Sequence, residues 1–145
     1  MMADRYQLNR FVEAQARVYP NVVDELRTGR KRTHWIWFIF PQLTGLGSSD
    51  MAERYAIASL GEARAYLAHD LLGHRLHECA RLLTAVQGRS IGEIVGSPDD
   101  LKVRSSMTLF ARAAGGGADA ADFVALLDKY YDGVEDPRTV SRLTG

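Results

Sequence analysis

Apolar residues recur along most of this chain at spacings of three and four positions, which is the period of an amphipathic α-helix. The first such segment follows Asp4 and runs from Leu8 to Tyr19. A longer stripe predicts the longest helix, over 71–87, and it consists of Leu72, Leu76, Cys79, Leu83 and Val86. Two further periodic segments predict helices over 98–113 and 119–132, so helical periodicity dominates the sequence.

Prolines and glycines mark the expected ends of these helices. Pro20 is expected to end the first helix, since a proline in a helix interior removes a hydrogen bond. Gly29 is expected to close a second, short helix over 21–28 in the left-handed conformation. Asp136 followed by Pro137 predicts the start of a short last helix.

Side-chain caps mark several predicted helix starts. Asp50, Ser59 and Ser90 are each followed three residues later by a glutamate, which is the spacing of a capping box. Asp70 is expected to cap the helix over 71–87. Ser97 is expected to cap a helix whose first residue is Pro98.

The run WIWFIF, residues 35–40, is apolar throughout and has high β propensity. No second run in the chain offers it a partner strand, and a lone strand in a core would leave backbone groups unpaired. A short helix that begins at Thr33 and stops before Pro41 accounts for the same residues. We therefore expect a single all-α domain over 1–145, with about seven to nine helices packed around this run.

Composition and charge narrow the class of protein. The 145 residues include 46% hydrophobic and 25% charged side chains, and 18 basic residues balance 18 acidic ones. Zero net charge argues against a dedicated nucleic-acid binder, because phosphate neutralisation supplies most of the affinity of such proteins. The longest apolar run is far shorter than the ~20 residues of a membrane-spanning helix. With no apolar leader at the N-terminus, a cytoplasmic location is expected.

Three blocks carry a resemblance to a known family. GRKRTHWIWFIFPQLTGLG is followed by ARAYLAHDLLGHRL and then by SPDDLKVRSSMTLFA. From 11 to 143 the chain resembles the bacterial family catalogued as domain of unknown function 1810, which includes a structurally characterised mycobacterial protein. The resemblance implies a multihelical domain without an assigned activity, and it supplies no catalytic residues. Members are often labelled calpastatin, but calpastatin is a disordered inhibitor, whereas this chain has capped helices and many core residues.

The first candidate site lies in the basic segment that precedes the apolar run. Its members are the cationic or polar residues Arg30, Lys31, His34 and Gln42 and the aromatic residues Trp35 and Trp37. Guanidinium groups bind phosphate through two hydrogen bonds, and indole rings stack on bases, so these residues suit a phosphate or nucleotide pocket. The alternative is a solvated basic turn that leads into a core helix with packed tryptophans.

The second candidate site lies on the helix over 98–113. Val103, Met107 and Phe110 share one face, whereas Lys102, Ser105, Ser106 and Leu109 lie on another. A lysine flanked by hydroxyl groups in a partly covered groove suits an anion, and Asp99 stands one turn before it. Alternatively, Asp99 only caps the helix electrostatically and the serines only permit close helix contacts. We expect Arg30, His34, Gln42, Lys102 and Ser106 to converge on one pocket.

No metal site or cofactor is predicted. Of His69, His74 and His77, only the last two share a helix face, and two ligands do not complete a zinc site. Cys79 lies in the apolar stripe and is expected to be an inert thiol. The glycines at 115–117 lack the GK[ST] continuation of a phosphate-binding loop and are interpreted as a connector.

The functional hypothesis is a small anionic ligand, nucleotide- or phosphosugar-like, bound where the segment 30–42 meets the segment 97–108. Whether the protein is an enzyme stays open. Metal-free hydrolysis or glycosyl transfer would have Lys102, His34 or Asp99 as acid–base candidates. The alternative is a non-catalytic module whose basic and aromatic rim docks a protein partner. A concave cleft would favour the ligand, and a flat aromatic patch would favour the partner.

Overall fold

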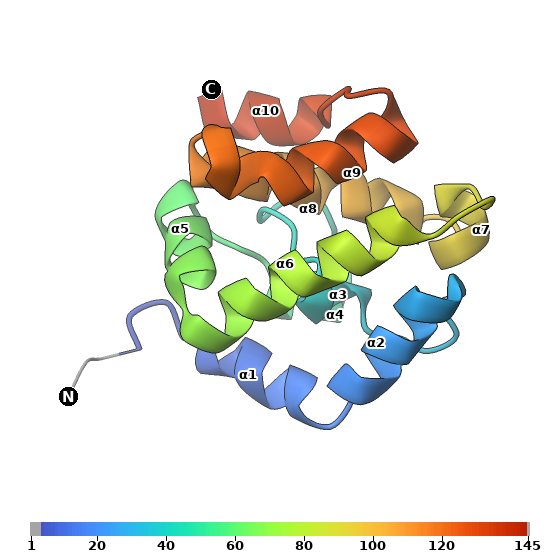
Figure 1. Ribbon diagram of the computed structural model, residues 1–145. Coiled ribbons are helices and arrows are strands. Elements are labelled where there is room, and N and C mark those ends of the chain that lie inside the picture. Colours follow the sequence, from blue (N-terminus) through green and yellow to red (C-terminus); the bar gives the residue numbers. More distant parts are fainter. Residues whose placement is uncertain (1–3, 145) are drawn as a thin grey trace.

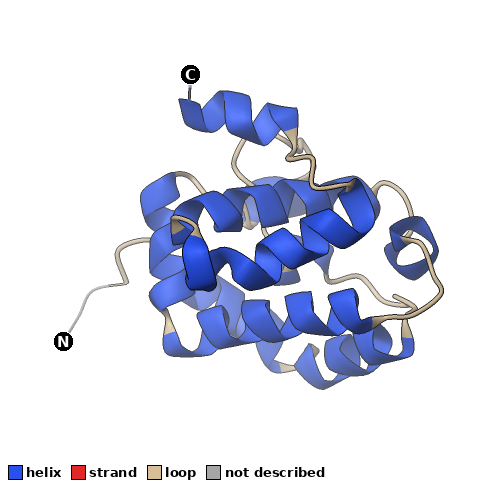
Figure 2. Ribbon diagram, turned by 45° about the horizontal axis from the view of Figure 1, so that its top comes forward, coloured by secondary structure: helices blue, strands red, loops and turns tan. Residues whose placement is uncertain are grey.

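The computed structural model describes residues 4–144, and this part of the chain is helical without a strand (Figures 1 and 2). It contains ten α-helices and one 3₁₀ helix: α1 (Asn9–Ala16), α2 (Tyr19–Thr28), α3 (Ile36–Ile39), α4 (Asp50–Arg54), α5 (Leu60–Ala68), α6 (Asp70–Ala85), α7 (Ile91–Val95), α8 (Asp99–Ala114), η1 (Gly117–Ala120), α9 (Ala121–Tyr131) and α10 (Pro137–Thr144). The predicted all-α class is confirmed. Three of the α-helices have five residues or fewer, so the shortest elements account for the excess over the predicted number.

Helices α6 and α8, of sixteen residues each, form the framework of the fold. Helix α6 packs against α2, α5 and α9, and α8 packs against α5, α7, α9 and α10. In Figure 1, α6 crosses the molecule diagonally, with α9 and α10 above it and α1 and α2 below it. The N-terminal half of α8 lies beside the loop after α3 and the start of α10.

The short helix α3 lies in the core, as the apolar run predicted. Trp35 and Phe38 to Phe40 are buried, whereas Trp37 is only partly buried. The helix begins after Trp35, so the expected start at Thr33 is wrong. The reason is a competing partner, because the Thr33 hydroxyl donates a hydrogen bond to the carboxylate of Glu25 at 2.7 Å.

Two predicted helix starts and one predicted end fall elsewhere. Pro20 lies in the first turn of α2, where its missing N–H is tolerated, and does not end α1. Ser49, and not Asp50, caps α4 by accepting the backbone N–H of Ala52 at 3.1 Å. His69, and not Asp70, caps α6. Its Nδ1 accepts two backbone N–H groups of the first turn, each at 3.2 Å. The imidazole ring of His69 therefore caps the helix in place of the Asp70 carboxylate.

Some of the other boundaries agree with the sequence pattern, whereas the start of α8 does not. Gly29 closes α2 with φ 77°, and Gly115 closes α8 with φ 79°. Ser90 and Glu93 form a complete capping box at α7. Helix α8 begins one residue later than expected, at Asp99, with no side-chain cap from Ser97.

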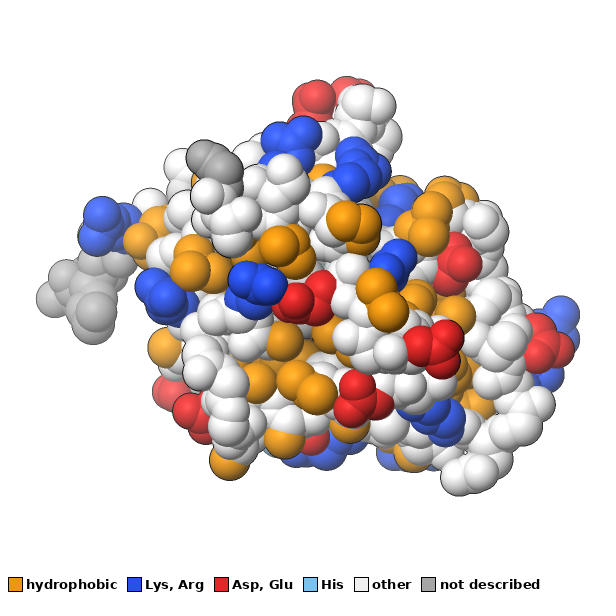
Figure 3. All heavy atoms as spheres, turned by 90° about the horizontal axis from the view of Figure 1, so that it is seen from above, with side chains coloured by type: hydrophobic (Ala, Val, Ile, Leu, Met, Phe, Trp, Pro, Cys, Tyr) orange, Lys and Arg blue, Asp and Glu red, His pale blue; other side chains and the backbone are white. Residues whose placement is uncertain are grey.

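No helix within residues 4–144 has the length and apolar character needed to cross a membrane. On the face above α9 and α10, hydrophobic side chains lie in several small patches separated by Lys, Arg, Asp and Glu (Figure 3). Such scattered apolar groups are ordinary for a protein surface.

Candidate functional site

A buried carboxylate holds the basic segment 30–35 in place. Glu25 is only 6% exposed and accepts the backbone N–H groups of Arg32 and Thr33 at 2.6 and 2.9 Å. It also accepts the Thr33 hydroxyl and the indole N–H of Trp35. Burial raises the pKa of this carboxyl, but the four hydrogen bonds outweigh burial and leave the pKa below its ordinary value. Glu25 is therefore ionised at neutral pH, and it orders the segment that precedes α3.

One aspartate joins the two candidate segments. The Lys31 ammonium lies 2.9 Å from Asp99 Oδ2, and the Lys102 ammonium lies 3.4 Å from Asp99 Oδ1. Lys31 also lies 5.1 Å from the centre of the Trp35 ring, and Lys102 lies 5.3 Å from the centre of the Trp37 ring. Two ammonium groups thus share one carboxylate, and Lys102 makes the longer contact. Its positive charge is only partly balanced.

Beside Lys102 the surface is hollowed into a groove of about 300 Å³, which we call the α8 groove. Three segments form its walls: the loop after α3, the N-terminal half of α8, and the start of α10. The lining residues are Gln42, Leu46, Gly47, Pro98, Leu101, Lys102, Arg104, Ser105, Asp136, Pro137 and Arg138. Four of them, at 98, 101, 102 and 105, follow the i, i+3, i+4, i+7 spacing of one helix face.

The carboxylate in the α8 groove accepts three hydrogen bonds through one of its two oxygens. Asp136 Oδ2 accepts the Ser105 hydroxyl at 2.9 Å, the Thr139 hydroxyl at 2.6 Å and the Thr139 backbone N–H at 3.2 Å. Burial raises the pKa of Asp136, but these bonds outweigh it, and the pKa lies below its ordinary value. Asp136 thus caps α10 as an anion, and all three bonds fall on its Oδ2 atom.

The two arginines of the groove use backbone carbonyls as partners. Arg104 donates from Nε to the Val134 carbonyl at 2.9 Å and from Nη2 to the Glu135 carbonyl at 3.0 Å. Arg138 donates from Nη2 to the Leu46 carbonyl at 3.0 Å. Because backbone carbonyls are neutral, none of these three bonds cancels the positive charge of an arginine.

The structure brings some of the predicted residues together and separates others. Gln42, Lys102 and Ser105 line the α8 groove, and Asp99 and Lys31 lie behind Lys102. Arg30 and His34 are exposed on the basic segment and do not line the groove. The tryptophans do not line it either, since Trp35 is buried and Trp37 lies beneath Lys102.

Two buried polar atoms near Lys102 make no hydrogen bond within the described chain: the indole nitrogen of Trp37 and the hydroxyl oxygen of Ser106. Ser106 is fully buried and stands one helical turn after Lys102. A buried polar group without a partner costs about 1–3 kcal/mol.

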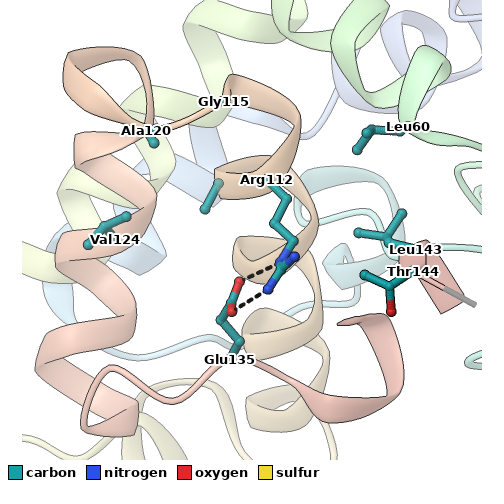
Figure 4. A pocket seen from close by; sticks show the side chains of 10 residues that line it. Leu60, Arg112, Gly115, Ala120, Val124, Glu135, Leu143 and Thr144 are labelled. Carbon is teal, nitrogen blue, oxygen red and sulfur yellow. Dashed lines mark hydrogen bonds and ion pairs between the residues drawn. The ribbon is translucent and has the colours of Figure 1, made fainter. Parts of the chain in front are cut away.

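Larger hollows lie elsewhere on the described surface. One of about 460 Å³ lies between the end of α8, α9 and α10, and Figure 4 shows its lining. Its charged groups, Arg112 and Glu135, face each other in a two-pronged pair with both contacts at 2.8 Å. Since they neutralise each other, that hollow presents mainly apolar side chains such as Leu60, Val124 and Leu143.

The histidines and the cysteine have structural surroundings. His69 caps α6, while the Nδ1 atom of His77 lies 2.9 Å from Asp122 and its ring stacks on Phe123. Residues 4–144 contain no group of three or more side chains arranged to hold a metal ion. Burial raises the pKa of Cys79 to about 12, which fits the inert thiol predicted from its place in the apolar stripe.

Sequence reasoning missed Glu25, Arg104, Asp136 and Arg138. For Glu25 a signal was present, because it lies three residues after Val22 and next to Leu26, on the buried face of α2. Arg138 had no such signal, because only the folded chain brings the start of α10 to the loop after α3.

Comparison with known proteins gives a family but no activity. The family described as "Protein of unknown function (DUF1810)" matches residues 5–143. The crystal structure of the conserved hypothetical protein Rv1873 from Mycobacterium tuberculosis matches with a TM-score of 0.94 and 65% sequence identity, over 98% of this chain and 99% of that one. No curated protein matches. The family resemblance noted in the sequence is therefore confirmed.

Proposed function

The chain belongs to the DUF1810 family, and we propose that it binds a small anionic ligand in the α8 groove. One observation carries this proposal: the groove is lined by three cations, Lys102, Arg104 and Arg138, and by a single carboxylate, Asp136, whose Oδ2 already accepts three hydrogen bonds. Positive charge in a concave site attracts an anion, and guanidinium and ammonium groups are the usual partners of phosphate.

The remaining lining suits a ligand with a polar, partly apolar body. Gln42 lines the groove and offers an amide that can both donate and accept. Leu101 is 58% exposed and offers an apolar surface at the rim. A volume of about 300 Å³ lies at the lower end of ligand pockets, so the groove suits a phosphorylated sugar or one part of a nucleotide.

The surroundings of the three acid–base candidates support ligand binding more than catalysis. Of the three acid–base candidates, His34 is exposed outside the groove and Asp99 is engaged by two lysines. Lys102 lines the groove, but an ammonium group paired with a carboxylate is a poor base. The protein-docking alternative finds less support, because the tryptophans expected to form its rim are buried or covered by Lys102.

The test replaces Lys102 by Met, which keeps the stem over Trp37 and removes the charge. AMP, ADP, NAD, glucose 6-phosphate and inorganic phosphate are screened by thermal shift, and any ligand found is titrated by calorimetry. We expect Lys102→Met to weaken binding by about tenfold or more while the melting temperature without ligand stays within about 2 °C. Arg17→Gln is the matched control, because Arg17 is exposed at the end of α1 and its loss changes net charge equally.

Two results would overturn the proposal. The first is that no compound in the panel raises the melting temperature of the parent protein. The second is that Lys102→Met binds the ligand as tightly as Arg17→Gln does.

A further inference from the structure

We infer that the α8 groove selects a phosphomonoester dianion, and that Arg138 of α10 binds it together with Lys102 of α8. This inference rests on the proposed function and adds to it the class of ligand and a second binding side chain. Three features carry it: the donors that the groove leaves unused, the charge that it leaves unbalanced, and the way in which Arg138 is held.

Unused donors remain on Lys102, Arg104 and Arg138. An ammonium group has three N–H donors, and Lys102 uses one of them in a 3.4 Å contact with Asp99. A guanidinium group has five, and Arg138 uses one on the Leu46 carbonyl. Arg104, on the same wall as Lys102, uses two of its five donors on the 134–135 backbone, at 2.9 and 3.0 Å. A ligand therefore finds its free donors on two different walls.

The unbalanced charge in and behind the groove is close to plus two. We count the charged side chains that line the groove, together with Asp99, which pairs with Lys102, and Lys31, which pairs with Asp99. The cations are Lys31, Lys102, Arg104 and Arg138, and the anions are Asp99 and Asp136, so four minus two leaves two. Asp100 does not line the groove, and its carboxylate accepts the backbone N–H of Leu101 at 3.0 Å. A ligand with two negative charges would balance this site.

The backbone of Arg138 is held in place, whereas its guanidinium group can exchange its present partner for a ligand. Asp136 caps the first turn of α10 through both donors of Thr139 and is tied to Ser105 of α8, so the start of α10 is fixed beside the groove. The guanidinium group itself is held by one neutral carbonyl at 3.0 Å. A phosphate dianion is a stronger acceptor than a carbonyl, and it can take two N–H groups of the guanidinium fork at once.

The charge requirement separates phosphomonoesters from diesters. A monoester carries nearly two negative charges above its second pKa of about 6, and it presents three terminal oxygens. A diester carries one charge and has only two such oxygens. Lys102 and Arg138, approaching from different walls, can both be satisfied by the monoester.

The experiment compares pairs of ligands that differ in this charge. AMP is set against 3′,5′-cyclic AMP, and glucose 6-phosphate against glucose 6-sulfate, by calorimetry with the full chain at pH 7.5. We expect the dianion of the better-binding pair to bind at least about tenfold more tightly than its monoanionic partner. We also expect Arg138→Gln to reduce this preference to about threefold or less, with little change in the affinity for the monoanion.

Arg142 provides a matched control on the same helix. Its Nη2 donates to the Gly45 carbonyl at 3.1 Å, so Arg142→Gln also removes one bond from α10 to the loop after α3, but Arg142 does not line the groove. We expect this variant to keep the dianion preference. Equal binding of dianion and monoanion, or a preference that survives Arg138→Gln, overturns the inference.

The failure of this inference can be told apart from the failure of the proposed function. If a ligand binds and Lys102→Met abolishes binding, but mono- and dianions bind alike, the selectivity is wrong and the binding site stands. If neither these four compounds nor ADP, NAD and inorganic phosphate bind the parent protein, both are wrong.

Discussion

The carboxylate of Glu25 accepts the indole N–H of Trp35 at 3.1 Å, and this bond ties the basic segment 30–35 to the buried face of α2. The same carboxylate accepts the backbone N–H groups of Arg32 and Thr33. Lys31 reaches Asp99 from this ordered segment, and Asp99 in turn holds Lys102. Glu25 therefore supports the position of the groove lysine from a distance.

We predict that Glu25→Gln destabilises the protein by about 1–3 kcal/mol. The amide keeps one acceptor oxygen but turns an NH₂ group toward donors that the carboxylate now satisfies. Urea denaturation measures the change in unfolding free energy. Glu13→Gln is the control, because Glu13 is an exposed carboxylate bonded to Asn9 at 3.0 Å on the surface of α1. Equal stability of the two variants would show that the bonds around Glu25 contribute nothing net.

Stability should fall in acid. The pKa values of Glu25 and Asp136 are below their ordinary values in the folded protein, so the unfolded chain binds more protons than the folded one at low pH. Their contribution is complete above the unfolded pKa values and is lost as pH falls through the folded ones. We therefore expect the melting temperature to decline below about pH 4, and to decline less steeply in Glu25→Gln. The same slope in parent and variant would contradict this assignment.

The helical part of the fold was predictable because its signals are local. Periodicity located α6, α8 and α9, and glycines located the ends of α2 and α8. The errors lie where a distant side chain competes with a local cap. Thr33 suits a helix start, but it binds Glu25 instead, and the first turn of α6 is satisfied by the ring of His69. Such competition is decided by tertiary contacts that no local pattern contains.

The site was predictable only in part for the same reason. Lys102 and Ser105 share a helix face, and Gln42 follows the apolar run, so sequence patterns placed these three residues near a common groove. Arg138 reaches the groove because α10 returns to α8 and the loop after α3. The basic residues Arg30 and His34 remain on the outer side of their segment, since Glu25 takes up its backbone amides.

Neighbouring serines on α8 should respond differently to the same change. The Ser105 hydroxyl lies 2.9 Å from Asp136 Oδ2, so Ser105→Ala should cost about 1–2 kcal/mol by removing a bond to a buried carboxylate. The Ser106 hydroxyl is fully buried and has no partner in the described chain, so Ser106→Ala should change stability by less than about 0.5 kcal/mol or increase it. Chemical denaturation compares the two. A large cost for Ser106→Ala would reveal a partner for that hydroxyl.

The last prediction concerns Lys31, which lies behind the groove and not in its wall. Its ammonium is the closer of the two partners of Asp99, at 2.9 Å against 3.4 Å for Lys102. Lys31→Met should keep the packing on Trp35 but leave Asp99 to Lys102 alone. Lys102 would then be drawn toward the Asp99 carboxylate and away from the groove. We expect calorimetry with a panel ligand to show binding weakened about three- to tenfold, less than in Lys102→Met. Unchanged affinity would mean that sharing Asp99 with Lys31 does not determine how much of the Lys102 charge is available to a ligand.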